Sequence, residues 1–431
     1  MQNSNRPFDR RDFLRASGAA GALALAGCAT SAAPPAKIGR VIVIGGGYGG
    51  ATAAKYLRMW SEGAIEVFMI EMNRSFVSCP LSNLVLGGSR RIEDLTVGYA
   101  GLREYGVQVI NDEVTKVNVD KKTVELKKIQ DLPYDRLIVS PGVDFMFDQI
   151  SALKDPQARE RVLHAWKAGP DTVALRQQLE AMRDGGVYVL SIPRAPYRCP
   201  PGPYERACQV AHYFKQAKPK SKVIILDANE DVVSKAGLFK AQWNGQYKGL
   251  IEYRNNNEVK DINLATMSAV LDVGADVKAD VLNVLPPMRA GTIAQQAGLI
   301  TANNRWCGVD WLSMESLARP GIHVLGDATL SAPAMPKSGH MANQHGKVAA
   351  AAIVELMNGR TPSPVPMMAN TCYSFVDDRN VVHVASVHAY DPKDKTMKAV
   401  PGSGGLSTAA SELEGAYANA WAKNIWHDML G

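Results

Sequence analysis

Residues Lys37 to Glu71, KIGRVIVIGGGYGGATAAKYLRMWSEGAIEVFMIE, set the architecture of the chain. The β-branched run 41–44 predicts a strand that is buried on both faces. Residues 51–58 continue as a helix, and residues 65–70 form a second apolar run. A strand, a glycine turn, a helix and a second strand in this order are typical of a Rossmann unit, so the sequence predicts an α/β fold.

The glycine spacing within this stretch indicates a dinucleotide site. Gly45, Gly47 and Gly50 form the pattern G-x-G-x-x-G. The first glycine makes the tight turn, the second lets the backbone approach a pyrophosphate, and the third lets the helix pack on the strand. Glu71 follows the second strand, where an acid binds the hydroxyls of a ribose. The pattern predicts a dinucleotide but does not say which one.

A second unit of the same layout is expected further along, without the nucleotide motif. A strand over 186–192, a helix over 204–216 and a strand over 222–226 repeat the order of the first unit. The turn between the first two, PRAPYRCPPGP at 193–203, contains no G-x-G-x-x-G. Because proline has no N–H group to offer a phosphate, we predict a Rossmann-like domain that has lost its nicotinamide nucleotide site.

These patterns divide the chain of 431 residues into two Rossmann-like domains and a small C-terminal α+β domain. A β-rich excursion is expected over 240–275, and a strand over 280–285 is expected to return to the first domain. The C-terminal part combines strands, as at 381–387, with a helix over 413–429. The predicted bounds are 1–36 for a signal and linker, 37–150 and 280–360 for the dinucleotide-binding domain, 151–279 for the second Rossmann-like domain, and 361–431 for a C-terminal interface domain.

A later strand carries an acid that can complete the same site. The strand over 321–326 leads into Asp327, which is placed to bind a polyol such as the ribityl chain of FAD; a strand-end cap is the alternative. A helix over 341–357 follows, with Lys337 just before it. The helix dipole together with Lys337 would stabilise a reduced, anionic flavin at this position.

The N-terminus has the pattern of an export signal. The run RRDFLR at 10–15 matches a twin-arginine motif, and the apolar run after it is too short to span a membrane. The run LAGC at 25–28 resembles a lipoprotein cleavage box, which leaves lipid anchoring at Cys28 as an alternative to later cleavage. No other stretch predicts a transmembrane helix, and a formal charge of +6 is too small to indicate nucleic-acid binding. We expect a periplasmic protein.

The cysteines indicate redox chemistry rather than a metal site. The chain has no C-x-x-C, no C-x-x-C-H and no Cys/His spacing suited to zinc, so we predict neither metal nor c-type haem on it. Cys199 lies in the proline-rich turn, where the following helix is expected to lower the pKa of its thiol. Cys199 and Cys372 are candidates for a redox pair, with a structural disulfide or two free thiols as alternatives. Cys208 and Cys307 are interpreted as small buried hydrophobic residues.

Several short motifs resemble one known family over nearly all of the mature chain. They are SCPLSN at 78–83, RCPPGPYERA at 198–207, GDA at 326–328, MPKSG at 335–339, NTCYS at 370–374 and AWAKNIWHD at 420–428. By these motifs the chain resembles the flavoprotein subunit of flavocytochrome c sulfide dehydrogenase, within the superfamily of sulfide:quinone reductases and disulfide reductases.

The resemblance implies a cofactor, a redox centre and a partner. It implies that the dinucleotide is FAD, bound covalently through a thioether between its 8α-methyl carbon and Cys79. It implies a redox-active disulfide Cys199–Cys372, with Glu205 as the nearby acid and Trp421 as an aromatic side chain close to the flavin. It also implies sulfide as the substrate and a c-type cytochrome as the partner subunit.

The implied reaction starts with hydrosulfide attacking the disulfide, which leaves a persulfide and a thiolate. Two electrons then pass to FAD and singly to the haem of the partner, with Glu205 moving protons. Two alternatives remain. A sulfide:quinone reductase would use an amphipathic C-terminal helix at a membrane, to which the charged residues within 413–429 are poorly suited. An FAD-binding accessory protein of a sulfur-oxidation complex is the other.

Overall fold

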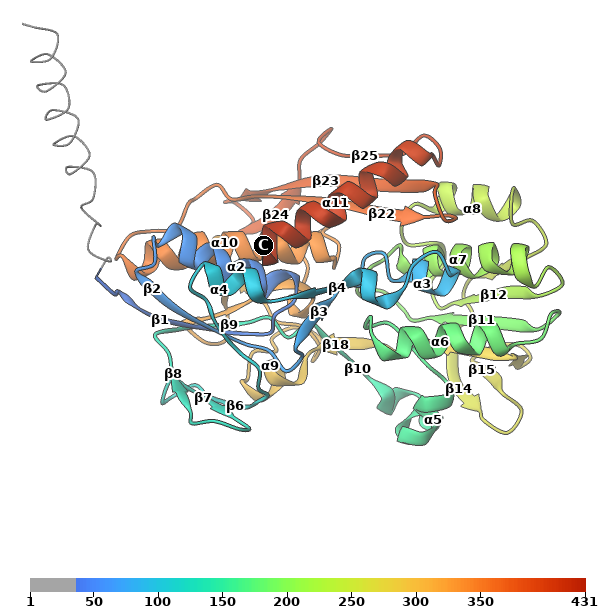
Figure 1. Ribbon diagram of the computed structural model, residues 1–431, viewed down its shortest axis with the longest axis horizontal. Helices are drawn as coiled ribbons and strands as arrows, with labels where there is room; N and C mark the ends of the chain where they lie inside the picture. Colours follow the sequence, from blue (N-terminus) through green and yellow to red (C-terminus); the bar gives the residue numbers. More distant parts are fainter. Residues whose placement is uncertain (1–35) are drawn as a thin grey trace, which may run out of the picture. The chain divides into compact units, whose positions relative to one another are not determined.

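The computed structural model describes residues 36–431, and residues 37–431 form one compact unit. The expected twin-arginine signal, including Cys28, lies outside the described residues. The described part has the predicted α/β architecture, with two Rossmann-like sheets and a C-terminal sheet with its helix (Figure 1).

The first Rossmann unit is built on a seven-stranded sheet in which five neighbouring strands are parallel and the two pairs at one edge are antiparallel. Strand β1 pairs with β2 on one side and with β9 on the other, and β9 pairs with β21. Helices α2 (Tyr48–Trp60) and α10 (Gly339–Met357) pack side by side (Figure 1). The strands are, in spatial order, β19 (Val309–Asp310), β20 (Glu315–Ser316), β21 (Ile322–Val324), β9 (Arg136–Val139), β1 (Gly39–Ile44), β2 (Ile65–Ile70) and β5 (Gln108–Ile110).

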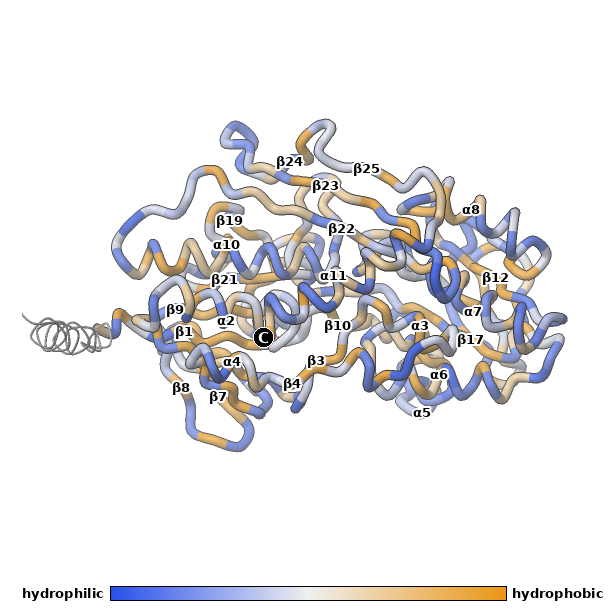
Figure 2. The backbone as a smooth tube through the Cα atoms, turned by 45° about the horizontal axis from the view of Figure 1, so that its top comes forward, coloured by the Kyte–Doolittle hydropathy of each residue, from blue (hydrophilic) through white to orange (hydrophobic). Residues whose placement is uncertain are grey.

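Strand β1 is buried as its sequence predicts. Val41, Ile42 and Val43 have no exposed surface, and the strand appears in hydrophobic colours in Figure 2. In the parallel register Ile44 lies opposite Ile70. The glycine turn and the acid that follows β2 therefore emerge at the same edge of the sheet.

The second Rossmann unit has a four-stranded parallel sheet. Its strands are, in spatial order, β13 (Ile251–Arg254), β12 (Lys222–Asp227), β11 (Val187–Ile192) and β17 (Val281–Val284). Its helices are α6 (Pro170–Ala181), α7 (Gly202–Ala217) and α8 (Ala236–Asn244). An antiparallel sheet is attached, formed by β14 (Val259–Asn263), β15 (Ser268–Leu271) and β16 (Val277–Lys278).

One prediction is wrong in this unit, and a second holds only in part. The strand expected at 280–285 to return to the first domain is β17, which pairs with β11 in the second sheet, Tyr188 lying opposite Val281. The region 240–275 begins inside α8 and contributes β13 to the parallel sheet, so only its later part is an excursion. The apolar patterns indicated burial in both places, but they could not say which neighbouring strand provides it.

The two units are joined by a short antiparallel ribbon. Strand β10 (Val143–Phe145) leaves the first unit, and β18 (Met288–Ala290) pairs with it. The chain therefore returns to the first unit after β17 and not at residue 280.

The C-terminal part covers both Rossmann units. Strand β22 contacts both α10 and α7, and α11 contacts α2, so this part runs along the top of both units in Figure 1. Its strands are β22 (Met367–Phe375), β23 (Val381–Asp391), β24 (Thr396–Ala399) and β25 (Gly405–Leu406), followed by α11 (Glu412–Leu430). This position brings β22 to the start of α7, where the candidate residues gather.

Short elements complete the described chain. The small strands are β3 (Ser75–Val77), β4 (Thr96–Gly98), β6 (Val114–Asn118), β7 (Thr123–Leu126) and β8 (Leu132–Pro133). The short helices are α3 (Asn83–Gly87), α4 (Ala100–Glu104), α5 (Pro156–Arg161) and α9 (Thr292–Gln296), with 3-10 turns η1 (Ile92–Leu95), η2 (Phe147–Gln149), η3 (Ser151–Lys154) and η4 (Gly326–Ala328).

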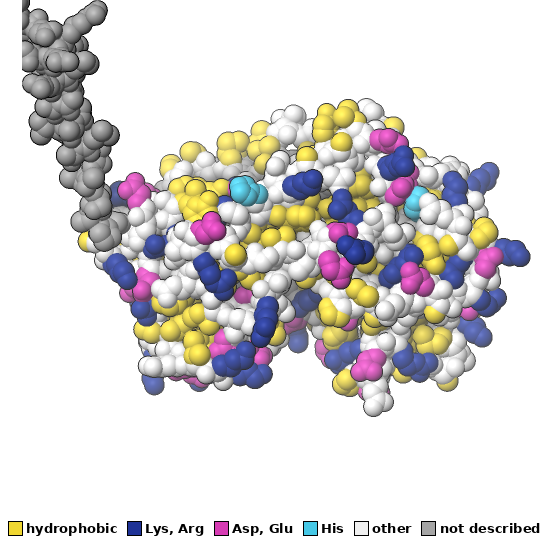
Figure 3. All heavy atoms as spheres, in the orientation of Figure 1, with side chains coloured by type: hydrophobic (Ala, Val, Ile, Leu, Met, Phe, Trp, Pro, Cys, Tyr) yellow, Lys and Arg dark blue, Asp and Glu magenta, His cyan; other side chains and the backbone are white. Residues whose placement is uncertain are grey.

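The visible surface carries charges of both signs. On the face shown in Figure 3, Lys and Arg side chains are interspersed with Asp and Glu. Within residues 36–431 no helix has the length and apolarity needed to cross a membrane.

Candidate functional site

One cavity of about 690 Å³ collects nearly all the residues that the sequence singled out. Its wall includes Gly45, Gly47, Glu71, Cys79, Cys199, Glu205, Asp327, Lys337, Cys372 and Trp421. These residues come from both Rossmann units and from the C-terminal part. Gly50 is the one predicted site residue that does not line the cavity, because it packs helix α2 onto β1.

The three motif glycines occupy three different environments. A Cβ atom on Gly50 would clash with the carbonyl oxygen of Gly45, and one on Gly45 would clash with that of Ser140. Gly45 also has φ +96°, a conformation that L residues rarely adopt. Gly47, the N-cap of α2, has φ −76° and nothing within 4 Å of an added Cβ. The space beside Gly47 is therefore where a pyrophosphate can approach the helix N-terminus.

Glu71 lies beside the glycine turn. Its Oε2 accepts a hydrogen bond of 2.8 Å from the backbone N–H of Gly46, and its Oε1 accepts two from Asn73. The carboxylate is thus fixed at the sheet edge and still faces the cavity. This position suits the ribose hydroxyls of a dinucleotide.

Asp327 contributes another carboxylate to the cavity wall, after strand β21. It belongs to η4, directly after β21, and its Oδ1 is buried without a hydrogen-bond partner among the described residues. Its Oδ2 lies 3.9 Å from Nε of Arg198. A buried carboxylate oxygen without a partner needs a donor, and a ribityl hydroxyl of FAD would provide one. Together with the open space at Gly47, this orphaned oxygen shows that the residues fit a bound FAD.

Lys337 is held by backbone carbonyls next to Asp327. Its ammonium group donates to the carbonyl oxygens of Asp327, at 3.0 Å, and of Thr329, and lies 3.8 Å from the ring centre of Trp306. Burial lowers the pKa of Lys337 to about 8. Helix α10 starts two residues later with Ser338 as its N-cap, so its N-terminus and Lys337 reach the cavity together.

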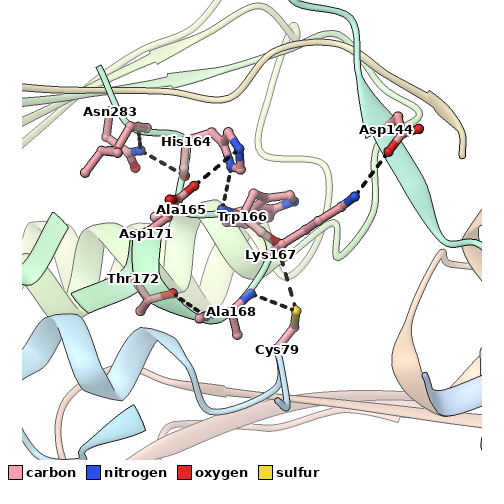
Figure 4. A network of polar contacts seen from close by, with 12 residues as sticks. Cys79, Asp144, His164, Ala165, Trp166, Lys167, Ala168, Asp171, Thr172 and Asn283 are labelled. Atoms are coloured by element: carbon pink, nitrogen blue, oxygen red, sulfur yellow. Dashed lines mark hydrogen bonds and ion pairs between the residues drawn. The ribbon is translucent and has the colours of Figure 1, made fainter. Parts of the chain in front are cut away.

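Cys79 lines the cavity and lies against the 164–168 segment (Figure 4). Its Sγ accepts a long hydrogen bond of 3.4 Å from the backbone N–H of Ala168 and lies 4.0 Å from the carbonyl oxygen of Trp166. The 164–168 segment is in turn anchored by Arg206, which donates to the carbonyl oxygens of His164 and Ala165. The Cys79 sulfur is therefore held in place while its residue stays only partly buried.

Cys199 and Cys372 meet on the same cavity wall, although they come from the loop before α7 and from β22. The structure carries both as free thiols, so the disulfide remains a prediction. The prediction that the helix lowers the pKa of Cys199 is wrong: burial raises it, and the nearby Cys372 and Glu205 raise it further. Helix α7 begins only at Gly202, so Cys199 lies outside the helix.

Glu205 is a buried acid beside this pair. Its Oε1 accepts a 2.8 Å hydrogen bond from the N–H of Phe375, and its Oε2 accepts one of 3.0 Å from Nδ2 of Asn83. Burial raises the pKa of Glu205, although these two hydrogen bonds oppose the rise. A carboxyl group that holds its proton above the usual range is suited to proton transfer near neutral pH.

Trp421 closes the cavity from α11. Its ring centre lies 5.7 Å from that of His340 in α10 and 6.0 Å from that of Tyr373 in β22, so two other elements contact it. The partly buried indole lines the cavity, and its closeness to a flavin stays a prediction from the family resemblance.

The proline-rich turn replaces a nucleotide site in the second unit. Asp227 ends β12 where a ribose-binding acid would lie, but it is fully buried and accepts hydrogen bonds from the hydroxyls of Tyr204, at 2.8 Å, and Tyr253, at 3.1 Å. Asn229 occupies its other oxygen. The acid is therefore used within the protein.

Comparisons with known proteins agree with this geometry. The family model "Sulfide dehydrogenase [flavocytochrome c] flavoprotein chain, central" matches residues 172–286, and "Flavocytochrome c sulphide dehydrogenase, flavin-binding" matches residues 364–430. A pyridine nucleotide-disulphide oxidoreductase model matches residues 39–179. The sulfide dehydrogenase flavoprotein chain of Chlorobaculum thiosulfatiphilum is 52% identical over 46 residues, which are 11% of this chain and 94% of that sequence.

The chain belongs to the family of flavocytochrome c sulfide dehydrogenase flavoprotein chains. Membership confirms the resemblance drawn from the sequence motifs, and with it the flavoprotein oxidoreductase class. A twin-arginine signal model matches residues 7–27, which supports the predicted export route.

Sulfide:quinone oxidoreductases are more distant relatives. The mitochondrial enzyme of Mus musculus is 22% identical over 306 residues, which are 67% of this chain and 65% of that relative's length. The crystal structure of the enzyme from Aquifex aeolicus superposes with a TM-score of 0.74 at 18% identity, covering 91% of this chain and 92% of that one. The structural match confirms the two-unit fold of this flavoprotein chain.

Several residues of the site are not among those the sequence predicted. Arg198 and Arg206 both line the cavity, and Arg206 is 1% exposed, with Asn83 and Asn283 as side-chain partners. Buried Lys235 contacts the strand that carries Cys372. The two arginines flank Cys199 and Glu205 in the motif at 198–207, and this position was the sequence feature that could have indicated them as site residues. Nothing in the local sequence distinguishes Lys235 from a surface lysine.

Glu205 makes the stability of this flavoprotein chain depend on pH. Because its folded-state pKa is raised, the folded protein binds more protons than the unfolded chain above the ordinary value of 4.5. The contribution to stability is complete below that value and is lost as the pH rises through the folded pKa. We expect the melting temperature of the wild type to fall more steeply from pH 4.5 upward than that of Glu205→Gln. Parallel melting curves against pH would contradict this assignment.

Proposed function

We propose that the chain is a periplasmic sulfide dehydrogenase flavoprotein, which oxidises sulfide to sulfur or polysulfide and passes electrons to a c-type cytochrome subunit. One observation carries the proposal. Cys199 and Cys372 both line the cavity that is also lined by the glycine turn and Asp327. A cysteine pair beside a flavin-binding cavity is suited to accept electrons from a sulfur nucleophile and pass them on. The missing nucleotide motif in the second unit argues against NADH as the donor.

FAD is the proposed cofactor, with its ADP half at Gly45, Gly47 and Glu71 and its ribityl chain at Asp327. When bound, it supplies a two-electron acceptor that can release electrons singly. Cys79 is the proposed point of covalent attachment, and it lines the same cavity as the other predicted FAD-binding residues except Gly50.

The cysteine pair and Glu205 carry the proposed chemistry. In the oxidised enzyme hydrosulfide attacks one sulfur of the Cys199–Cys372 disulfide; a new S–S bond forms, the old one breaks, and its electron pair stays on the other cysteine as thiolate. The result is one persulfide and one thiolate, with no other reactant. Glu205, whose pKa burial raises, interacts with both thiols; its protonated form can give a proton to a thiolate, and its ionised form can take one from bound hydrogen sulfide.

The electron acceptor separates this proposal from two alternatives. The structural likeness to a sulfide:quinone oxidoreductase favours quinone as the second candidate acceptor. Helix α11 carries Lys423 and His427, which are exposed, and Asp428. The Asp428 carboxylate accepts hydrogen bonds from Tyr56 and Lys347 within the protein. This charged surface suits a water-facing partner better than a lipid one. An FAD-binding accessory protein without turnover is the third reading.

The test uses the purified chain with its co-purifying or added c-type cytochrome. We expect sulfide to reduce the haem in the presence of the flavoprotein, and NADH to leave it oxidised. Faster reduction of a quinone analogue than of the cytochrome would favour the quinone alternative. Reduction of the flavin by NADH would sink the proposal, and a failure of sulfide to reduce the flavin would favour an accessory role.

Covalent attachment is tested separately through Cys79. We expect flavin to stay with the acid-precipitated wild-type protein and to be released from Cys79→Ala, because the variant lacks the sulfur that would form the thioether. Intact mass, higher than the polypeptide by one FAD in the wild type alone, checks the same point. Cys307→Ala is the matched control, since this cysteine is fully buried outside the cavity. Free flavin in the wild type would rule out the thioether.

A further inference from the structure

Lys235 is a buried lysine next to the cysteine pair but outside the cavity wall. It is 5% exposed and precedes α8 with φ +58°, a conformation that non-glycine residues seldom adopt. A lysine that is buried in such a conformation requires compensating contacts, because an ammonium group is costly to remove from water.

All three donors of this ammonium have acceptors, and these acceptors surround Cys372. Nζ donates to the carbonyl oxygen of Cys372 at 3.0 Å, to Oγ of Ser374 at 2.7 Å and to the carbonyl oxygen of Val382 at 3.2 Å. The first two partners belong to β22 and the third to β23. The contacts fix the backbone of the cysteine itself and place a positive charge beside it.

The surroundings of the two cysteines are therefore unequal. Besides Lys235, Cys372 has Nδ2 of Asn370 at 3.4 Å from its Sγ, a donor suited to a thiolate. No hydrogen bond reaches Sγ of Cys199 among residues 36–431, and this sulfur lies against Gly202. Burial raises the pKa of both thiols. Lys235 is the first group that opposes the rise at Cys372, whereas at Cys199 only the charge of Arg198 opposes it, after Cys372 and Glu205 have added to the rise. The pKa of Lys235, lowered by burial to about 8, leaves it charged at neutral pH.

The other charged and titratable groups that face Lys235 come from three elements. They are Glu205 of α7, Glu414 of α11 and Cys199 of the loop before α7. Burial raises the pKa of Glu205, which disfavours a negative charge on this neighbour of the ammonium.

We propose that Lys235 is a positioning residue that makes Cys372 the leaving thiolate of the disulfide and so directs hydrosulfide to Cys199. This inference rests on the proposed function. In the step, HS⁻ forms an S–S bond with Sγ of Cys199, the Cys199–Cys372 bond breaks, and its electron pair stays on Sγ of Cys372 next to the ammonium. Attack in the opposite direction would leave the thiolate on Cys199. Its Sγ accepts no hydrogen bond from the described residues, whereas Sγ of Cys372 has Nδ2 of Asn370 as a donor.

The first measurement is the pH dependence of cysteine alkylation in the dithiothreitol-reduced, flavin-loaded protein. Iodoacetamide labelling is followed at each cysteine by peptide mass spectrometry. We expect the midpoint for Cys372 to lie below that for Cys199 in the wild type. In Lys235→Met it should rise by about one pH unit or more, a tenfold loss of thiolate, and in Lys235→Arg it should stay close to the wild type. A Cys372 midpoint that is unchanged in a folded Lys235→Met protein overturns the proposal.

The second measurement locates the persulfide. Oxidised protein is mixed with one equivalent of sulfide, and the persulfide is trapped by alkylation. We expect it on Cys199 in the wild type and on both cysteines in Lys235→Met. A wild-type persulfide on Cys372 contradicts the direction of attack, whereas the absence of any persulfide contradicts the proposed function and leaves the alkylation result standing.

A conservative variant keeps the proposal testable if Lys235→Met does not fold. Ser374→Ala removes one acceptor of the ammonium and leaves its charge, so a smaller upward shift of the Cys372 midpoint is expected, with Cys199 unchanged. Equal shifts at both cysteines would indicate a general loosening of the fold and would overturn the role assigned to Lys235.

Discussion

Replacing Cys199 or Cys372 by serine is expected to lower the rate of sulfide-dependent flavin reduction by about a thousandfold or more. Serine leaves no disulfide for hydrosulfide to attack, so the proposed reaction loses its electrophile rather than one contact. A thousandfold loss corresponds to about 4 kcal/mol of activation free energy. Stopped-flow measurement of flavin absorbance after mixing with sulfide gives the rate directly, without the cytochrome.

Cys208→Ala is the matched control for these variants. Cys208 lies on α7, the helix that follows the loop of Cys199. It is fully buried in the core and does not line the cavity. The variant is expected to lose some stability and to keep the rate of flavin reduction within a few-fold. A Cys372→Ser protein that reacts with sulfide at more than a tenth of the wild-type rate would mean that the cysteine pair is not the entrance for electrons.

Alanine at two motif glycines is expected to fail for two different reasons. Gly50→Ala puts a Cβ against the carbonyl oxygen of Gly45, so α2 must move away from β1, at a cost of about 1–3 kcal/mol of folding free energy. Gly47→Ala meets nothing within 4 Å and has an ordinary φ, so its fold should persist. Its methyl group would instead occupy the space that a pyrophosphate needs.

The two variants are separated by melting temperature and by flavin content. We expect Gly50→Ala to lower the melting temperature of the protein with or without FAD, and Gly47→Ala to lose most bound flavin while its flavin-free form melts like the wild type. Gly98→Ala is the control, since Gly98 also has open space and lies outside the cavity. A Gly47→Ala protein with full flavin content would show that the dinucleotide does not approach the turn at this residue.

The parts of the site that follow from local sequence could be predicted well. The turn at Gly45, the acid at Glu71 and the acid at Asp327 each come at the end of a strand, and parallel strands bring such ends to one edge. The prediction that residues 280–285 return to the first domain is wrong, because these residues form β17 and pair with β11 of the second unit. A pattern of buried residues records burial but not the partner strand.

The chemistry around the cysteines depended on contacts that span the chain. Glu205 accepts a hydrogen bond from the N–H of Phe375, which is 170 positions away in the chain. Lys235 donates one to the carbonyl oxygen of Cys372, which is 137 positions away. The sequence motif placed Cys199 before a helix and so predicted a lowered pKa, but the raised pKa comes from burial. Burial and neighbouring charges are set by the whole fold.

The amino-acid sequence by itself determined the glycine turn with its following acid, the loss of the second nucleotide motif, and the family. These features depend on residue types at short spacings. Only the tertiary structure decided that β17 belongs to the second unit, that the C-terminal part covers both units, and that Lys235 lies beside Cys372. Each of these depends on which distant segments bury one another. The proton affinity of a thiol or an ammonium follows from that burial, so it cannot be derived from neighbours in the chain.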